Sequence, residues 1–373
     1  MSKKYGIIGF EYALPTYYIS HDDLAHETSS DPNKYKIGLD LHEMGVPSPK
    51  EDVVSLALTA TKRLLKKYNV NVNAVGKVEV GTESNFDTSK SIKTYIMQLF
   101  ENTKIQGADT TNACYGGCNA LINCLTWVES RFNHENKMAI VVCTDISVHN
   151  FLPAVPTSGA GAVAILIGEN PVFRVHDIMS HYSTNTYDFC KPISNFPYCI
   201  LDAPISLDLY LKAFKQCYND VKNTYKFDYM CCHTPYPKLV KKALVSCDVD
   251  PEIAEKSLIA GRRNANSYTV SVFLSLISIL SHDVKIGEKI GLFSFGSGCV
   301  STIMCLEKVA DGCDDFSDFN IRLDKRIKMD PKRYLKMIQS KHDLKDYVPI
   351  DDVEIDGFYL ESISGYKRSY KYN

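Results

Sequence analysis

The sequence predicts an α/β protein made of two similar halves, and two observations lead to this prediction. Short apolar strands alternate with amphipathic helices along the chain, which is typical of sheets covered by helices. The same kinds of element then return in the same order in the second half. With 373 residues, of which 45% are hydrophobic and 23% charged, the chain is long enough for two to three domain-sized units with large cores.

The first half shows the alternation most clearly. Residues 4–10 read as a strand, and residues 51–68 read as a helix with apolar positions along its length and a basic end. We then expect a strand, two helices and a buried strand, over residues 77–81, 89–100, 114–131 and 137–144. A glycine-rich hairpin at 158–161 precedes the apolar run AVAILIG.

The second half repeats this order. A strand ends at His233, a helix opens near Asn266, and a hairpin follows at 297–298. The first half has Glu83 at its strand end and Cys114 at its helix start, 31 residues apart, whereas His233 and Asn266 are 33 residues apart. Two halves related by a pseudo-two-fold axis would bring these four residues toward one cleft.

Composition excludes several classes of protein. The chain has 42 basic and 44 acidic side chains, a net charge of −2, so it lacks the positive surface that nucleic-acid binding needs. The uncharged segment 264–281 contains Asn, Tyr, Thr and several Ser, and therefore reads as a buried helix. We expect no membrane segment and no nucleic-acid partner.

The cysteines and the N-terminus predict a reducing compartment. Thirteen is an odd number of cysteines, and the first apolar run is short for a signal sequence and is interrupted by Glu11. An arginine-rich presequence is also missing. We therefore expect reduced cysteines and a cytoplasmic location.

Cys114 is the first candidate for chemistry. It lies in TNACYGG, where two glycines allow other backbone to approach closely, at the expected first turn of an apolar helix. A helix N-terminus favours a thiolate, so we expect a lowered thiol pKa. The alternative is a buried structural thiol, which is how we interpret Cys118 and Cys124 on the same helix.

Glu83 and His233 follow strand ends, where α/β folds expose functional side chains. Taken singly, Glu83 reads as a solvated loop residue and His233 as an ordinary surface or core histidine. Their matching places in the two halves favour a shared site. After His233, the segment KLVKKAL contains Lys238, Lys241 and Lys242, which suit phosphate groups at a cleft mouth or simply a solvated face.

Metal and nucleotide motifs are missing from the sequence. There is no HExxH, no paired CxxC and no GxxxxGK[ST], and the adjacent Cys231 and Cys232 have poor spacing for a chelate. We expect no bound metal.

At these residues the sequence resembles the hydroxymethylglutaryl-CoA synthase family of the thiolase superfamily. The resemblance runs nearly end to end, over blocks in the same order: EVGTES, SKSIKTYIMQLFE, DTTNACYGG, PTSGAGAVAILIG, YDFCKP, HTPYPKLVKK, NSYT and GLFSFGSG, with GFYLESISGYKRSY at the end. It implies a thiolase-like five-layer αβαβα fold of two pseudo-two-fold halves, which we place at residues 1–170 and 171–373.

The resemblance also implies an activity. The family condenses acetyl-CoA with acetoacetyl-CoA and water to form HMG-CoA and CoA, in the mevalonate pathway, with CoA thioesters as substrates and no cofactor. A homodimer is implied. Cys114 is then the nucleophile that becomes acetylated. Glu83 is the general base, with a pKa raised by burial, and His233 binds the second substrate and donates a proton to the new alcohol.

Further positions follow from the same resemblance. Backbone N–H groups of Cys114 and Ser297 are the expected oxyanion donors, and Asn266 orients an acyl oxygen. The remaining substrate-binding positions are Lys34, Thr157, Asp188, Ser206, Lys238, Lys242 and Tyr268.

The chain departs from the family pattern at two places. It has Asp40-Leu41 where Gly-Gln is usual, and Leu152-Pro153 where Gly-Asn is usual. It is also shorter than typical eukaryotic members, which we attribute to missing surface insertions in the second half.

Several other functions share parts of this pattern. A thiolase would need a second catalytic cysteine, for which Cys299 is the candidate, and a β-ketoacyl synthase would not need Glu83. A polyketide β-branching synthase would take its acyl group from a carrier protein. A non-catalytic CoA-thioester-binding relative and a papain-like hydrolase are the remaining alternatives, although the latter's local cysteine signature is missing.

Overall fold

A single mixed sheet runs through the molecule. The computed structural model describes residues 4–192, 198–312, 315–340 and 345–373. Its main sheet follows the order β12 (Tyr229–Cys232), β13 (Lys289–Gly296), β14 (Val300–Lys308), β8 (Phe173–Val175), β1 (Tyr5–Ala13), β7 (Ala160–Glu169), β6 (Met138–Ile146), β4 (Val75–Gly81) and β5 (Asp109–Thr110), with β9 (Ser180–Ser183) paired to β14. The short β8 joins the strands of the two halves.

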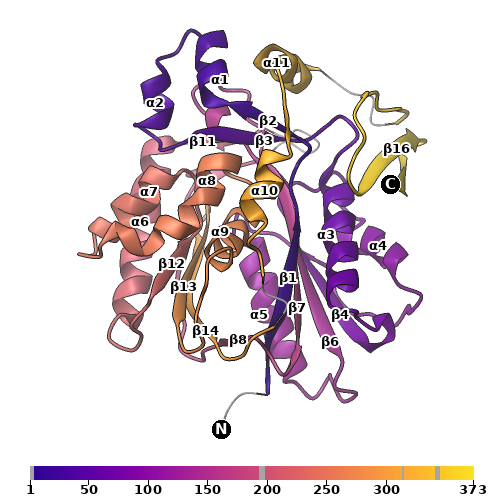
Figure 1. Cartoon of the computed structure of the whole chain (residues 1–373), viewed down its shortest axis with the longest axis vertical. Coiled ribbons are helices and arrows are strands. Elements are labelled where there is room, and N and C mark those ends of the chain that lie inside the picture. Colours follow the sequence, from indigo (N-terminus) through magenta and orange to yellow (C-terminus); the bar gives the residue numbers. More distant parts are fainter. Residues whose placement is uncertain (1–3, 193–197, 313–314, 341–344) are drawn as a thin grey trace.

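Helices form layers on and between the two parts of this sheet (Figure 1). On the outside of the first half, α3 (Val53–Lys67) packs against β1, β7 and β6. On the outside of the second half lie α6 (Ala203–Val221) and α7 (Pro237–Val245). Between them, α5 (Gly116–Val128) and α9 (Val270–Leu280) share one hydrophobic core, and every residue of α9 is buried. The layers therefore alternate as helix, sheet, helix, sheet, helix, which confirms the predicted fold class.

The repeated order of elements is also confirmed. In the first half β4 and β6 are parallel and β6 and β7 antiparallel, and in the second half β12 and β13 are parallel and β13 and β14 antiparallel. The loops that precede the two central helices both contain a residue with left-handed backbone, Ala113 (φ 42°) before α5 and Tyr268 (φ 49°) before α9. Such values are uncommon outside glycine and mark tight loops that fix the side chains beside them.

Some predicted helices begin later than expected; α9, for example, begins at Val270 and not near Asn266. The segment 89–100 forms only α4 (Ile92–Ile96) and a 3₁₀ turn at Met97–Leu99. The reason is local: the Asp109 carboxylate accepts from the N–H groups of Ile92 and Lys93 and so caps the helix there, while Asp87 binds the backbone of the preceding turn. Similarly, α5 starts at Gly116, after Cys114 instead of at it.

Smaller elements surround the ends of the main sheet. A three-stranded sheet contains β2 (Tyr17–Ser20), β3 (Glu43–Val46) and β15 (Ile327–Lys328), and a C-terminal hairpin contains β16 (Phe358–Ser364) and β17 (Lys367–Tyr372). The short helices are α1 (His21–Glu27), α2 (Pro32–Lys36), α8 (Leu258–Asn264), α10 (Phe319–Asp324) and α11 (Pro331–Gln339), and β10 (Phe189–Cys190) pairs with β11 (Ile200–Leu201).

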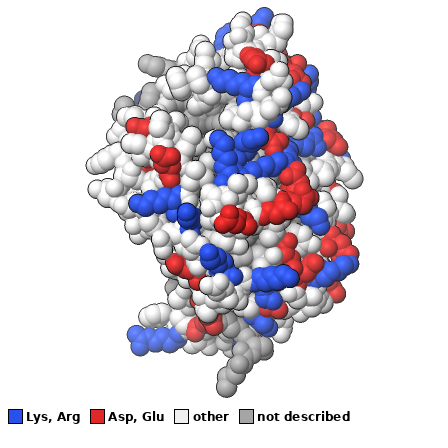
Figure 2. Space-filling model, turned by 90° about the vertical axis from the view of Figure 1, so that its left-hand side faces the viewer, with Lys and Arg blue, Asp and Glu red and all other residues white. Residues whose placement is uncertain are grey.

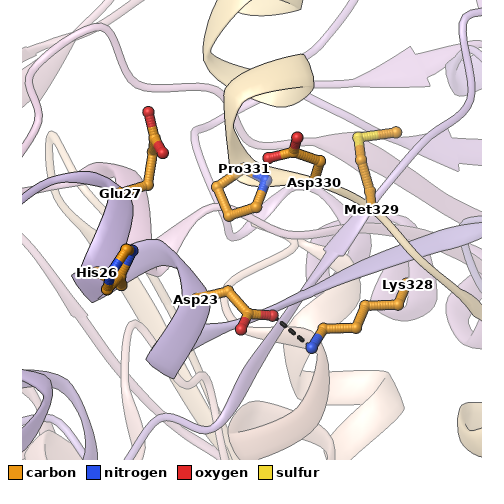
Figure 3. Close-up of a pocket in the computed structure, with 7 residues that line it drawn as sticks. All are labelled: Asp23, His26, Glu27, Lys328, Met329, Asp330 and Pro331. Atoms are coloured by element: carbon orange, nitrogen blue, oxygen red, sulfur yellow. Dashed lines mark ion pairs between the residues drawn. The ribbon is translucent and has the colours of Figure 1, made fainter.

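A pocket of about 390 Å³ lies between α1 and the start of α11, where Asp23 and Lys328 form an ion pair at 2.6 Å (Figure 3). It contains none of the predicted site residues. Throughout the described ranges, helices that could cross a membrane are absent. The twelve cysteines in those ranges are free thiols.

Candidate active site

Cys114 lies in a loop between β5 and α5, two residues before the helix begins. The loop is tightly packed, because a Cβ atom on Gly81 would lie 2.3 Å from the backbone of Gly117, and one on Gly116 would lie 2.5 Å from the carbonyl oxygen of Thr110. The glycines therefore do allow the close backbone approach that the sequence predicted.

Glu83 follows the end of β4 and contacts Cys114 directly. The Cys114 thiol donates to Glu83 Oε1 with a distance of 3.4 Å between sulfur and oxygen. The Glu83 side chain is only 5% exposed, and burial raises its pKa, in the direction that the sequence predicted.

The expected lowering of the Cys114 pKa is wrong. Burial, followed by the nearby Glu83 and Asp145 carboxylates, raises the pKa of this thiol well above its usual value. The thiol points to a carboxylate, and the helix starts only at Gly116. The helix N-terminus therefore does not determine the direction in which the pKa of Cys114 shifts. Cys114 is therefore a neutral thiol whose nearest proton acceptor is Glu83.

Two further ionisable residues complete this cluster, and neither was predicted from the sequence. Lys191 Nζ lies 3.3 Å from Glu83 Oε2 and 3.4 Å from the Glu83 carbonyl oxygen. Asp145, at the end of β6, is fully buried and accepts at Oδ1 from Glu83 N and at Oδ2 from Thr269 N. The only available signals were an aspartate directly after the buried run AIVVCT and a lysine inside the family block YDFCKP.

Asp145 connects the two halves of the site. Besides the bonds from the two backbone N–H groups, its carboxylate accepts hydrogen bonds from the hydroxyl groups of Thr82 and Ser84, at 3.0 and 2.8 Å. Thr269 in turn accepts from Gly117 N at 2.6 Å, so the starts of both central helices are held to the end of β4. Burial and the charge of Glu83 raise the pKa of Asp145, against the effect of its hydrogen-bond donors.

His233 follows β12 and is buried. Its Nδ1 lies 2.8 Å from Ser271 Oγ, and Ser271 Oγ also lies 2.9 Å from the Tyr268 carbonyl oxygen. Both contacts are hydrogen bonds when Nδ1 carries the proton and the serine donates to the carbonyl, which leaves Nε2 as an acceptor. Burial lowers the pKa of His233 to about 3, so the imidazole is neutral.

Asn266 and Tyr268, in the loop before α9, lie beside a third predicted substrate residue, Thr157, which is in the 3₁₀ turn before β7. Asn266 N donates to the Thr157 carbonyl oxygen at 2.9 Å, and Asn266 Oδ1 accepts from Tyr268 N at 2.9 Å. The Tyr268 ring lies 4.3 Å from Lys191 Nζ, which joins this group to the Glu83 cluster.

Ser297 and Asp188 form a second group at the β13–β14 hairpin. Asn112 Nδ2 donates to the Ser297 carbonyl oxygen at 3.2 Å, which holds this hairpin beside the Cys114 loop. Gly298 N donates to Oδ1 of the buried Asp188, whose Oδ2 has no hydrogen-bond partner among the described residues. Cys299, the candidate second cysteine of a thiolase, is buried, and burial raises its pKa to about 12.

The other predicted substrate residues lie outside this cluster. Lys34 is exposed on α2, Ser206 is half-buried in the first turn of α6, and Lys238 and Lys242 are exposed on α7. Lys238 N donates to the Leu39 carbonyl oxygen, so α7 begins beside the loop that follows α2. Figure 2 shows the face of the molecule on which α6 and α7 lie in Figure 1. Basic and acidic side chains are mixed on this face.

The departure at Asp40-Leu41 has a structural explanation. Asp40 forms two hydrogen bonds with Arg262, each 2.9 Å long, and an ion pair with Lys241 at 3.0 Å, while Leu41 is fully buried. The positive charge of Lys241 is therefore balanced by the Asp40 carboxylate. Leu152 and Pro153, the second departure, are exposed.

In the described ranges, no three or more His, Cys, Asp or Glu side chains are grouped so that they could hold a metal ion.

Comparisons with known proteins identify the family of the chain. The model of the hydroxymethylglutaryl-coenzyme A synthase N-terminal family matches residues 1–171, and that of the C-terminal family matches 175–248 and 245–373. Hydroxymethylglutaryl-CoA synthase A of Dictyostelium discoideum is 33% identical over 98% of this chain and 91% of its own length. The synthase of Saccharomyces cerevisiae is 33% identical over 98% and 89%.

Solved structures are similar over the whole chain. MvaS in complex with 3-hydroxy-3-methylglutaryl coenzyme A superimposes with a TM-score of 0.89 at 28% identity, covering 100% of both chains. An HMG synthase of the curacin biosynthetic pathway, at 23% identity and a TM-score of 0.88, shares the fold.

Proposed function

This chain belongs to the hydroxymethylglutaryl-CoA synthase family, and we propose that it condenses acetyl-CoA with acetoacetyl-CoA and water to form HMG-CoA and CoA. It is thus an acyl-transferring condensing enzyme. The observation that most directly supports the reaction is the contact between the Cys114 thiol and the Glu83 carboxylate.

In the first step, the Cys114 sulfur attacks the thioester carbon of acetyl-CoA. The thiol is neutral, so it must lose its proton as it attacks, and Glu83 Oε1 is the acceptor 3.4 Å away. The carbon–sulfur bond to CoA then breaks, and CoA leaves with this proton. Backbone N–H groups of Cys114 and Ser297 are the proposed donors to the oxyanion, and Asn266 orients the acyl oxygen.

In the second step, Glu83 removes a proton from the methyl group of acetyl-Cys114. A carboxyl group with a raised pKa is a stronger base for this than an ordinary glutamate. The enolate attacks the ketone carbon of acetoacetyl-CoA and forms the new carbon–carbon bond. Water then hydrolyses the thioester to Cys114, which releases HMG-CoA and restores the thiol.

We propose a revised role for His233. The family resemblance implied that this histidine both binds the second substrate and donates a proton to the new alcohol. Because the hydrogen bonds of its Nδ1 leave Nε2 as an acceptor in the resting protein, Glu83 is the better proton donor. Glu83 holds the proton that it has just removed, and His233 keeps the role of positioning acetoacetyl-CoA.

The substrates enter this proposal as CoA thioesters, and no cofactor takes part, since both acyl groups arrive activated. Lys238 and Lys242 are proposed to bind CoA phosphates, with Lys34, Thr157, Asp188, Ser206 and Tyr268 as further substrate contacts. We also propose that the protein is a homodimer, acts in the mevalonate pathway and is located in the cytoplasm. The similar human and chicken proteins are named cytoplasmic.

The test is product formation with purified protein. Incubation with acetyl-CoA and acetoacetyl-CoA should yield HMG-CoA and free CoA in equal amounts, measured by chromatography and mass spectrometry, and Cys114→Ala should yield none. A folded protein that makes no product from these substrates would contradict the proposal. Acetyl groups presented on a carrier protein are the comparison substrate, because the β-branching alternative requires them.

A further inference from the structure

Lys191 occupies an unusual place beside the proposed general base. It follows β10, and its Nζ contacts both Oε2 and the carbonyl oxygen of Glu83. Its position is fixed from the other side by two aromatic rings, since Nζ lies 4.3 Å from the Tyr268 ring centroid and 5.7 Å from that of Phe189. A cation on ring faces is attracted to them, so the ammonium group has a defined place.

The two carboxylate oxygens of Glu83 contact different partners. Oε1 accepts from the Cys114 thiol and Oε2 pairs with Lys191. The carboxylate is thereby held with one oxygen toward the sulfur on which the acetyl group would form. Without Lys191, Oε2 would lose its ion-pair partner in a buried site, where an unpaired charge is costly.

The groups that face Glu83 are otherwise acidic or neutral. They come from the end of β6 (Asp145), the loop before α5 (Cys114), the loop before α9 (Tyr268) and the residue before β11 (Cys199). His149 lies near Lys191, and its pKa is lowered to about 4 by burial and by that lysine, so it is neutral. Among the described residues, Lys191 is the only cation in ion-pair contact with Glu83.

We propose that Lys191 is a positioning residue for the general base: its ammonium group keeps Glu83 ionised and aimed at the acetyl group on Cys114. This inference rests on the proposed function, since it concerns the base of that reaction. Lys191 acts through Glu83 and not on the substrate. Its loss should therefore change the pH at which condensation begins, which a merely structural lysine would not do.

The test compares Lys191→Met, which keeps the length of the side chain and removes the charge, with Lys191→Arg, which keeps the charge. Condensation is measured against pH after each protein is first acetylated with acetyl-CoA. An opposite charge at this distance lowers a carboxyl pKa by roughly 1–3 units. In Lys191→Met the acidic limb of the profile should therefore move up by at least about one pH unit, whereas Lys191→Arg should stay near the wild type.

A second measurement does not need activity. In a Cys114→Ala background, the infrared band of the protonated Glu83 carboxyl group, assigned by its loss in Glu83→Gln, is titrated with and without Lys191→Met. A higher midpoint in the Met variant supports the inference, and Lys191→Gln replaces Met if that variant does not fold. Unchanged midpoints and unchanged pH profiles would overturn the role of Lys191. A wild-type protein that forms neither acetyl-enzyme nor HMG-CoA would instead overturn the proposed function.

Discussion

The Cys114 thiol and the Glu83 carboxylate lie in contact, with Sγ 3.4 Å from Oε1, although 31 residues separate them and each lies in a loop after a different strand. Both side chains are almost completely buried, and burial raises the pKa of each. The pair therefore rests as a neutral thiol beside a buried carboxylate, and in the proposed mechanism the proton moves only when an acyl group arrives.

Replacement of Glu83 should separate acetylation from condensation. Glu83→Ala removes the proton acceptor for both the thiol and the acetyl methyl group. A thiol attacks a thioester readily once water or CoA takes its proton, so an acetyl adduct should still form, more slowly. The methyl proton is far less acidic, so HMG-CoA formation should fall by roughly 10²- to 10⁴-fold. Labelled acetyl-CoA on a denaturing gel measures the first effect and product analysis the second. Equal losses in both steps would contradict this assignment.

His233→Ala should impair the second substrate selectively. The imidazole is proposed to position acetoacetyl-CoA, so we expect a higher KM for that substrate and normal acetylation of Cys114. Because burial lowers the pKa of His233 to about 3, the wild-type profile should show no limb from this histidine between about pH 5 and 8. A limb near the usual histidine pKa that disappears in His233→Asn would contradict the neutral imidazole.

The lysines of α7 provide a matched set. Lys238 and Lys242 are exposed, whereas Lys241 is paired with Asp40 and Glu255. If the first two bind CoA phosphates, Lys238→Ala and Lys242→Ala should each raise the KM for CoA thioesters several-fold, and the increase should shrink at high salt. Lys241→Ala is the control from the same helix and should change KM much less. Three equal effects would indicate a general surface charge.

The contribution of Glu51 to the free energy of unfolding should decrease as the pH rises. This carboxyl is about nine-tenths buried and accepts from Ser48 N and Thr16 N, and burial raises its pKa from 4.5 to about 7. The folded state therefore binds a proton that the unfolded state has lost, so its contribution is full below about pH 4.5 and is lost as the pH rises through 7. The full effect is about 3 kcal/mol.

Glu51→Gln keeps an oxygen for both N–H groups and removes the titration. Its free energy of unfolding in urea should consequently fall less between about pH 5 and pH 8 than that of the wild type. An identical slope in the two proteins would show that Glu51 is already ionised in the folded state.

Much of the fold and the central pair of residues could be predicted from the sequence. Strand and helix patterns are local, and the repeated order matched Glu83 with His233 at strand ends and Cys114 with Asn266 at helix starts. The error in the Cys114 pKa arose because the helix begins two residues later than expected and because the thiol faces a carboxylate. A sequence does not show which charges face a thiol after folding.

Asp145 and Lys191 were missed for the same reason. Each is an ordinary polar residue at or beside a strand, and its importance comes from its contact with Glu83. Asp145 lies 62 positions after Glu83 in the sequence, and Lys191 lies 108 positions after it. The division of the chain at residue 170 stays a prediction, since β8 continues the sheet directly from one half to the other.

The most direct test of the account is the intact mass of the purified protein after acetyl-CoA alone and then after acetoacetyl-CoA. We predict one adduct of about 42 Da, the mass of an acetyl group, that is absent in Cys114→Ala and disappears on addition of acetoacetyl-CoA as HMG-CoA forms. An adduct that persists in Cys114→Ala, or a folded protein that forms neither adduct nor product, would contradict the covalent route through Cys114.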